Sequence, residues 1–92
     1  MNDVLEIKDS ETIIALAKAL SSETRFGILK LLIDKELSIS KIAKEMNQTE
    51  ANTSAQVKML EKNGLMENRY EPGAHGVRNV CKTKIRKIVL EI

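Results

Sequence analysis

Two side-chain amides, those of Asn52 and Gln56, lie four residues apart in a segment with helical periodicity. Residues at this spacing share one face of an α-helix. A side-chain amide donates and accepts side by side, so in the major groove of DNA it can form a bidentate pair with the N6 and N7 groups of adenine. These two residues are therefore the first candidates for reading bases.

Neighbouring residues extend this candidate surface. Glu50 can accept a hydrogen bond from cytosine N4, and Ala51 or Ala55 can touch a thymine methyl group. The alternative is that the polar residues only cover the solvated side of a surface helix. The full set of DNA-binding candidates in this region is Lys41, Thr49, Glu50, Ala51, Asn52, Ala55, Gln56 and Lys58.

Two short helices joined by a tight turn, within residues 38–62, would have to position these side chains. The hydroxyl of Ser40 is predicted to cap the first helix. Asn47 tolerates the left-handed conformation that often ends a helix, so the chain can turn sharply there. Thr49 is predicted to cap the second helix. We expect the inward residues to be Ile42, Ala43 and Met46 in the first helix and Thr53, Val57 and Leu60 in the second. This is the outline of a helix-turn-helix.

A strand, a turn and a second strand are predicted after Gly64, which stands where a helix C-terminal cap is expected. The segments are 65–71, 72–76 and 77–83, and the Pro and Gly residues between the two strands indicate a hairpin. A hairpin after a recognition helix is a wing.

Basic side chains are expected on this wing. His75 and Arg78 would lie near its tip, with Arg69 and Lys82 on its arms. Such groups hold backbone phosphates or enter the minor groove. The alternative for each charge is an ordinary solvated position.

Two further helices form the predicted hydrophobic base. The first is capped by Asp9 or Ser10 and the second by Ser21 or Ser22. They are expected to bury Ile13, Ile14, Leu16, Ala17 and Leu20, and then Phe26, Ile28, Leu29, Leu32 and Ile33. A short extended stretch at Ile39, after Leu37, is predicted to pair with the wing, and the core is expected to close with Leu65, Tyr70 and Val80.

Both ends of the chain are rich in β-prone residues. Residues 3–8 and 87–92 share a Leu-Glu-Ile string, and each segment is typical of an edge strand. Pairing them with each other, within one chain or across a dimer, would satisfy their backbone groups. We expect residues 1–8 to form an N-terminal strand and residues 84–92 a C-terminal strand, the alternative for the latter being a helix of two turns.

Composition limits the classes of function. The net charge is +2, and residues 41–92 hold ten Lys or Arg against six Asp or Glu, whereas residues 1–40 hold five against seven. This surplus is smaller than that of proteins that bind nucleic acid by charge alone, which favours a sequence-specific binder. Aromatic residues make up only 2% of the chain, which argues against a platform that stacks RNA or single-stranded bases.

No catalytic or metal-binding arrangement is apparent. The single His and single Cys, Cys81, cannot alone complete a tetrahedral zinc site, so we expect no metal or other cofactor. Cys81 is interpreted as a structural thiol, with an intermolecular disulfide or a reactive thiol as alternatives. No Gly-rich phosphate loop or nucleophile–base pair indicates an enzyme. No apolar run approaches membrane-spanning length, so we expect a cytoplasmic protein without a membrane partner.

A resemblance to a known family rests on two segments. Residues 16–32 contain Ser-Glu-Thr-Arg-Phe-Gly-Ile-Leu within a leucine-rich context, and residues 57–65 end in Leu-Glu-Lys-Asn-Gly-Leu. Both resemble ArsR-type (ArsR/SmtB-like) winged-helix regulators, with their "(Asp or Ser)-x-Thr-Arg-x-x-Ile-Leu" start and "Leu-x-x-x-Gly-Leu" exit into the wing. The similarity covers roughly residues 13–83 in the correct order.

This resemblance implies a homodimeric, cytoplasmic transcriptional regulator, usually a repressor, that binds a partly palindromic operator in double-stranded DNA. Metal-sensing members carry a Cys-x-Cys-type pair before the recognition helix or Asp and His ligands near the C-terminus. Residues 37–46 contain no Cys, His or Asp, and residues 84–92 contain no His. Metal sensing is therefore not carried over, and any small-molecule effector is unknown. The family usually ends in a helix, so the predicted C-terminal strand is a departure from its pattern.

The prediction is thus a single domain over residues 1–92 of the α+β class, mainly α: a winged helix-turn-helix with a β-hairpin wing and short terminal strands. The leading function is a sequence-specific DNA-binding transcriptional regulator. The alternatives are a winged helix used for protein–protein contact and a nonspecific architectural DNA binder.

Overall fold

The structure, a computed structural model, describes residues 3–92 and contains four helices and five strands in that range. Within it, no helix has the length and apolar character needed to cross a membrane. Residues 1–2 of the predicted N-terminal strand lie outside the described part. In chain order the elements are β1 (Val4–Ile7), α1 (Ser10–Leu20), α2 (Glu23–Leu31), β2 (Leu37–Ser38), α3 (Ile39–Met46), α4 (Glu50–Lys62), β3 (Glu67–Gly73), β4 (Gly76–Lys82) and β5 (Lys87–Leu90).

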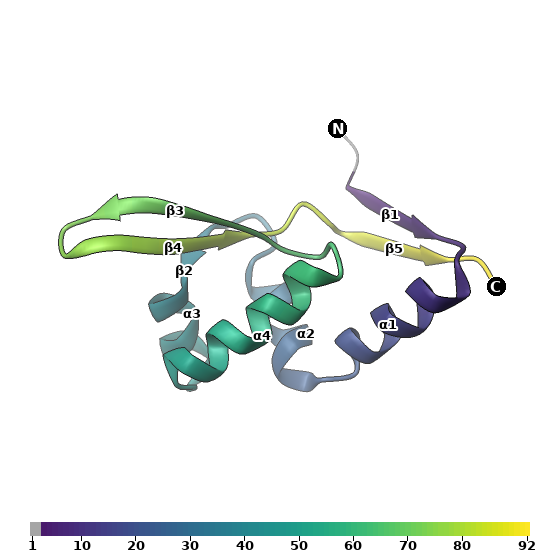
Figure 1. Ribbon diagram of the computed structural model, residues 1–92, viewed down its shortest axis with the longest axis horizontal. Coiled ribbons are helices and arrows are strands. Elements are labelled where there is room, and N and C mark those ends of the chain that lie inside the picture. Colours follow the sequence, from purple (N-terminus) through teal and green to yellow (C-terminus); the bar gives the residue numbers. More distant parts are fainter. Residues whose placement is uncertain (1–2) are drawn as a thin grey trace.

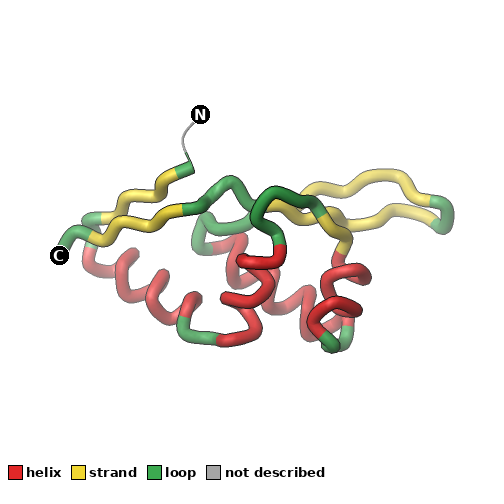
Figure 2. The backbone as a smooth tube through the Cα atoms, turned by 180° about the vertical axis from the view of Figure 1, so that it is seen from behind, coloured by secondary structure: helices red, strands yellow, loops and turns green. Residues whose placement is uncertain are grey.

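The strands lie along one side of the molecule and the helices along the other (Figures 1 and 2). One sheet has three antiparallel strands in the order β2-β4-β3, and the other pairs β1 with β5 in parallel. The hairpin of β3 and β4 extends beyond the helices at one end (Figure 1). The predicted fold class, an α+β winged helix-turn-helix with a hairpin wing and short terminal strands, is confirmed.

Apolar side chains from all four helices meet under the sheets. Leu16, Ile28, Leu32, Ile42 and Leu60 are fully buried, and they form one core cluster that also includes residues of the strands and loops. Removing such side chains from water is the main favourable term in folding. The core holds α3 and α4 against α2, and so fixes the direction in which α4 presents its other face.

Some residues predicted to be buried are exposed. Ile14 and Phe26 are 57% and 47% exposed, and Ala17 is also exposed, because α1 and α2 are covered on one side only. Tyr70, on the edge strand β3 of the three-stranded sheet, is 73% exposed. The burial predictions for these four residues were wrong, whereas those for Leu65 and Val80 are confirmed.

The helix caps follow the sequence prediction with one exception. Asp9, Ser22 and Thr49 cap α1, α2 and α4, each accepting a hydrogen bond from a backbone N–H three residues on. For α3 the cap is Ser38, not Ser40, because β2 ends at Ser38 and its hydroxyl accepts from the Lys41 N–H at 3.3 Å. The helix therefore already includes Ile39, which was expected to lie in the extended stretch.

The wing strands also differ from their predicted limits. They span 67–73 and 76–82 with only two residues between them, so 72–73 belong to the first strand and not to the turn. Leu65 and Met66 precede β3 and are buried. Gly64 has a φ of 75°, the left-handed conformation expected of a residue just beyond a helix end.

The chain ends pair within one molecule. β1 and β5 run parallel, with Val4 beside Lys87 and Ile7 beside Leu90. The C-terminal segment is thus a strand over 87–90 and not a helix of two turns. This sheet has only two strands. One edge of β1 and one edge of β5 therefore have no neighbouring strand among the described residues.

Candidate nucleic-acid interface

The turn between α3 and α4 is set by Asn47. Its φ and ψ of 55° and 47° are left-handed, as expected, and the Gln48 N–H donates to the Ala43 carbonyl at 2.9 Å. Thr49 then caps α4 by accepting from the Asn52 N–H at 3.0 Å. These contacts fix the angle at which the second helix leaves the first.

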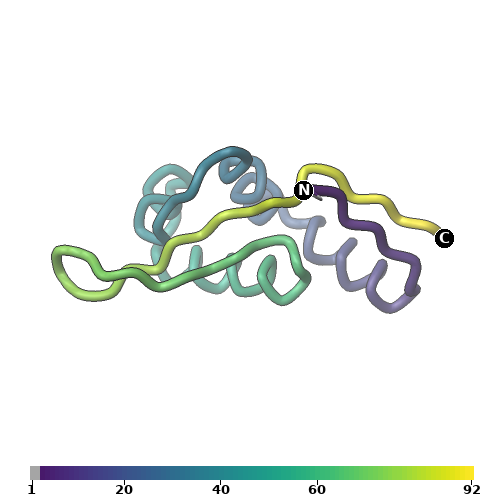
Figure 3. The backbone as a smooth tube through the Cα atoms, turned by 90° about the horizontal axis from the view of Figure 1, so that it is seen from above, coloured from purple at the N-terminus to yellow at the C-terminus, as the bar shows by residue number. Residues whose placement is uncertain are grey.

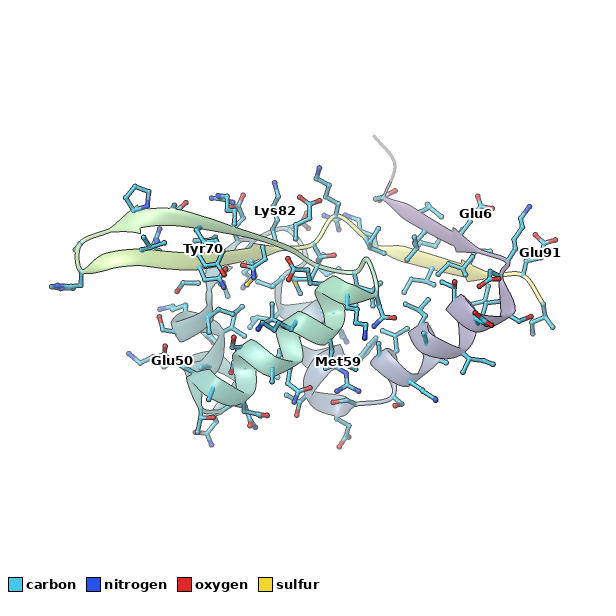
Figure 4. The ribbon with its side chains drawn as sticks, in the orientation of Figure 1. Glu6, Glu50, Met59, Tyr70, Lys82 and Glu91 are labelled. Atoms are coloured by element: carbon cyan, nitrogen blue, oxygen red, sulfur yellow. The ribbon has the colours of Figure 1, made fainter. Side chains whose placement is uncertain are left out.

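Opposite faces of α4 have opposite environments. Thr53, Val57 and Leu60 are buried, and the Thr53 hydroxyl donates to the Thr49 carbonyl at 2.9 Å, so that no polar atom of this side chain is left unpaired in the core. Figure 4 labels Glu50 near the start of the helix and Met59 further along it. The exposed residues on the opposite face, which we call the outer stripe, are Ala51, Ala55, Lys58, Met59 and Lys62.

Asn52 and Gln56 do not lie on the outer stripe. They are half-buried on the flank of α4, joined by a hydrogen bond from Gln56 Nε2 to Asn52 Oδ1 at 3.1 Å. Asn52 Nδ2 also donates to Gln48 Oε1 at 2.7 Å, and Gln56 Oε1 accepts from Arg25 at 2.8 Å. Both amides therefore have intramolecular partners that a base would have to replace.

Arg25 connects this flank of α4 to α1 and α2. Besides Gln56, its guanidinium donates to the carbonyls of Ala19 at 2.7 Å and Lys18 at 3.1 Å. It therefore bridges the end of α1, the start of α2 and the middle of α4. Sequence reasoning used Arg25 only for family resemblance and missed this positioning role, because no local pattern links it to a residue 31 positions away.

The wing carries its basic residues in an ion-pair network. Glu71 accepts from Arg78 at 2.9 and 2.6 Å and from Arg69 at 3.0 Å, and Arg69 also pairs with Glu36. Arg78 and then Arg69 hold the pKa of the Glu71 carboxyl below its usual range. The network keeps two cations on one face of the wing, but with acidic partners. His75 lies exposed in the two-residue turn at the tip, as predicted.

A groove of about 450 Å³ separates the wing from the start of α4. It brings the predicted residues Glu50, Ala51 and Arg78 together. Sequence reasoning missed Ser54 and Asn79, which also line it, because neither falls in a recognisable motif. Lys41, Ala55 and Lys58 are exposed but do not line this groove, and Thr49 acts through its capping bond.

Cys81 lies in the core and not at the interface. Its side chain is fully buried, and its thiol is 3.8 Å from Asn68 Oδ1. Burial, with a smaller contribution from Glu61, raises the pKa of the thiol to about 11, so it stays protonated near neutral pH. Within residues 3–92 no three His, Cys, Asp or Glu side chains are grouped so as to hold a metal ion.

Comparisons with known proteins agree with this geometry. The family model described as "Helix-turn-helix domain" matches residues 20–69. The transcriptional activator HlyU of Vibrio cholerae is 31% identical over 64 residues, which are 70% of this chain and 59% of that protein. This chain thus spans less than two thirds of the length of that curated relative.

Solved structures are similar as well. The homodimeric winged helix-turn-helix DNA-binding domain of a possible ArsR-family regulator from Mycobacterium bovis, determined in solution, has a TM-score of 0.70 and 27% identity, covering 80% of this chain and 65% of that one. Reduced HlyU from Vibrio cholerae has a TM-score of 0.64 and 30% identity, covering 76% and 72%. The family match, which extends to residue 69, includes the helix-turn-helix and the start of the wing.

Proposed function

This chain belongs to the ArsR-type family of winged helix-turn-helix transcriptional regulators, and from that premise we propose that it binds double-stranded DNA as a homodimer and regulates transcription. The observation that carries the proposal is the exposed outer stripe of α4 beside the wing groove. The major groove admits one α-helix, so the exposed face of α4 is suited to enter it.

The outer stripe supplies the first set of contacts. Ala51 and Ala55 have small side chains, which let the helix approach the base edges and touch thymine methyl groups. Lys58 and Lys62 lie further along the same stripe and would neutralise phosphates, as would Lys41 on α3. Glu50, at the start of α4, would accept from cytosine N4.

The flank and the wing supply the second set. Asn52 and Gln56 would pair with adenine after exchanging their present hydrogen bonds for bonds to the base. Arg69, His75 and Arg78 on the wing would contact the backbone or the minor groove. The ion pairs with Glu71 lower the net positive charge of the wing. This favours a protein that recognises the base sequence over one that binds DNA through charge alone.

A homodimer would read a partly palindromic operator, because the two-fold symmetry of the protein is mirrored in the DNA. Whether the protein represses or activates transcription then depends on where the operator lies relative to the promoter. A dimer that covers the promoter represses, and we propose this mode for the present chain. A reporter gene placed behind the selected operator measures the sign directly.

The test is a selection from a randomised duplex pool at two salt concentrations. We expect enrichment of a palindrome whose half-sites are spaced by about one helical turn. Binding without enrichment that vanishes at moderate salt would contradict sequence reading and indicate an architectural binder. Absence of binding at both salt concentrations would indicate a protein-contact module.

A matched pair of variants locates the interface. Ala55→Glu places a negative charge in the centre of the outer stripe, and Ala17→Glu places the same charge on the exposed face of α1. We expect the first to weaken operator binding by at least about 100-fold and the second to leave it nearly unchanged, since like charges oppose approach to phosphates. Equal effects would contradict the assignment of α4 as the reading helix.

A further inference from the structure

One edge of β5 is open. β5 pairs with β1 along its other edge, and among residues 3–92 no strand lies on the open one. From above, β1 and β5 run side by side and the far edge of β5 borders no other strand (Figure 3). The Lys87 N–H donates to the carbonyl of Asp3, just before β1, at 3.3 Å, and the Glu91 N–H donates to the carbonyl of Ile7, the last residue of β1, at 2.9 Å. Because successive peptide groups alternate in direction, those of Ile88 and Leu90 point to the open edge.

An apolar groove lies beside this edge. It has a volume of about 470 Å³ and is formed by one face of α2 and the segment leading into β5, with no residue of β1 or α1. Phe26 is left half-exposed in it. The lining residues are Phe26, Leu29, Lys30, Ile33, Ile85, Arg86 and Ile88.

Two apolar side chains near the end of the chain are not covered by other parts of the protein. Leu90 is 41% exposed, and Ile92 is fully exposed. Both alternate with Val89 and Glu91 along the chain, so they share the side of β5 that carries Ile88, the side that faces the groove. An open strand edge, an apolar groove and two uncovered apolar side chains thus lie together.

We propose that a second copy of this chain occupies this surface. The two β5 strands pair antiparallel about a two-fold axis at Val89, and Leu90 and Ile92 of each copy fill the α2–β5 groove of the other. The inference rests on the homodimer of the proposed function and specifies its interface. The joined sheet has four strands in the order β1-β5-β5-β1.

The charges along β5 select this register. Antiparallel pairing centred on Val89 places Lys87 opposite Glu91 of the second copy, twice, and Ile88 opposite Leu90. Opposite charges facing each other across two strands are favourable. The same register makes Ile88 and Leu90 the hydrogen-bonded pairs, as the direction of their peptide groups requires.

The open edge of β1 is a poorer partner. Self-pairing centred on Glu6 would place two glutamates opposite each other, and the apolar groove contains no β1 residue. Figure 4 shows Glu6 and Glu91 on the side of the terminal strands away from the helices. A two-fold axis perpendicular to the sheet keeps the helices of both copies on the same side, where two recognition helices can face one duplex.

Disulfide cross-linking tests whether the two-fold axis lies at Val89. Two cysteines opposite each other in a non-hydrogen-bonded antiparallel pair have Cα atoms about 4.5 Å apart, within the range of a disulfide. Under mild oxidation of the native protein, Val89→Cys should therefore give mostly covalent dimer. The matched control is Glu6→Cys, which lies beside Val89 on β1 and on the same face, and should stay mostly monomeric on a non-reducing gel. Equal cross-linking of both variants, or none of Val89→Cys while the wild type is dimeric, overturns the inference.

The dimer dissociation constant, measured by sedimentation, tests whether the α2–β5 groove is part of the interface. Ile92→Asp removes no contact within one chain, since Ile92 is fully exposed, yet it should raise the dimer dissociation constant at least about 100-fold because two side chains leave the interface. Ile14→Asp, on the exposed face of α1, should leave the constant unchanged. The reverse order of effects would place the interface on α1. A wild type that stays monomeric even on operator DNA would overturn both this interface and the proposed homodimer, whereas a wild-type dimer unaffected by Ile92→Asp overturns the interface alone.

Discussion

Arg78 lies directly opposite Glu71 on the wing hairpin and donates two hydrogen bonds to the same carboxylate oxygen, at 2.9 Å from Nε and 2.6 Å from Nη2. Arg69 donates to the other oxygen at 3.0 Å. One glutamate thus pairs with both arginines of the wing. All three side chains are partly exposed, so the pairs themselves contribute little to stability.

Replacing Glu71 should therefore strengthen DNA binding. In Glu71→Gln the two guanidinium groups lose a competing anion, so affinity at low salt should rise several-fold. The slope of log K against log salt should steepen by about one unit for each phosphate newly contacted. A fluorescence titration at four salt concentrations measures both quantities.

The control for this prediction is Glu67→Gln, which removes the same charge from the base of the same strand, where it pairs with Lys84. It should change affinity less and leave the slope nearly unchanged. If the two variants gave identical slopes, the effect would be one of net charge and not of released arginines.

The contact between Arg25 and Gln56 predicts an energetic coupling between the base of the fold and the recognition helix. Their hydrogen bond is 2.8 Å long and partly buried, and it involves a charged donor. Hydrogen bonds to charged groups contribute about 1.5–3 kcal/mol. A double-mutant cycle of Arg25→Ala and Gln56→Ala, followed by urea unfolding, should give a coupling of about 1 kcal/mol or more.

The matched cycle pairs Arg25→Ala with Asn52→Ala. Asn52 contacts Gln56 but makes no hydrogen bond to Arg25, so its coupling to Arg25 should be smaller. Additive effects for Arg25 and Gln56 would show that this contact does not couple the two helices in solution.

The hydrogen-bonded flank also shows how far the sequence could predict the site. Local signals gave the turn at Asn47, the cap at Thr49 and the buried face of α4, because each depends on neighbouring residues. The same signals identified Asn52 and Gln56 as exposed amides. Their bonds to each other and to Arg25 depend on the packing of α2 against α4, which no short pattern encodes.

A similar limit applies to burial. Helical periodicity predicted Phe26 and Ile14 as core residues, but periodicity reports only which side of a helix is apolar. Whether that side is covered depends on neighbouring elements, and in a chain of 92 residues few are available. Tyr70 is likewise left uncovered on the edge strand β3. Of these residues, Phe26 lines the groove in which we propose that a second chain binds.

The buried thiol predicts a pH dependence of stability. The folded pKa of Cys81 is about 11, above the value of about 8.5 for a free thiol, so the folded state holds the proton more tightly. The contribution of the protonated Cys81 thiol to the free energy of unfolding is complete below about pH 8.5 and is lost as the pH rises toward 11. Urea unfolding at pH 8 and pH 10.5 should show a loss of about 2 kcal/mol in the wild type relative to Cys81→Ala.

Cys81→Ala serves as the reference because every other titratable group is common to the two proteins. It is expected to be less stable at both pH values, since it leaves a small cavity in the core. The difference between the two proteins should shrink as the pH rises. A constant difference would mean that the thiol is solvated in the folded state.

The left-handed conformation of Asn47 predicts a contrast between two substitutions. Asn47→Gly should leave the free energy of unfolding unchanged or raise it slightly, because Gly adopts a φ of 55° without strain. Asn47→Ala should lower it by about 1 kcal/mol, since residues with a Cβ other than Asn and Asp adopt this conformation at a cost. Thermal or urea unfolding of the three proteins measures the series.

The control is the second Asn that ends a helix, Asn63, whose φ of −97° is open to any residue. There Asn63→Gly should be less stable than Asn63→Ala, the reverse of the order at Asn47, because Gly adds backbone entropy to the unfolded chain without relieving strain. The same order at both positions would contradict a strained turn at Asn47. Since that turn sets the direction of α4, Asn47→Ala should also weaken operator binding more than its loss of stability alone predicts, whereas Asn47→Gly should preserve binding.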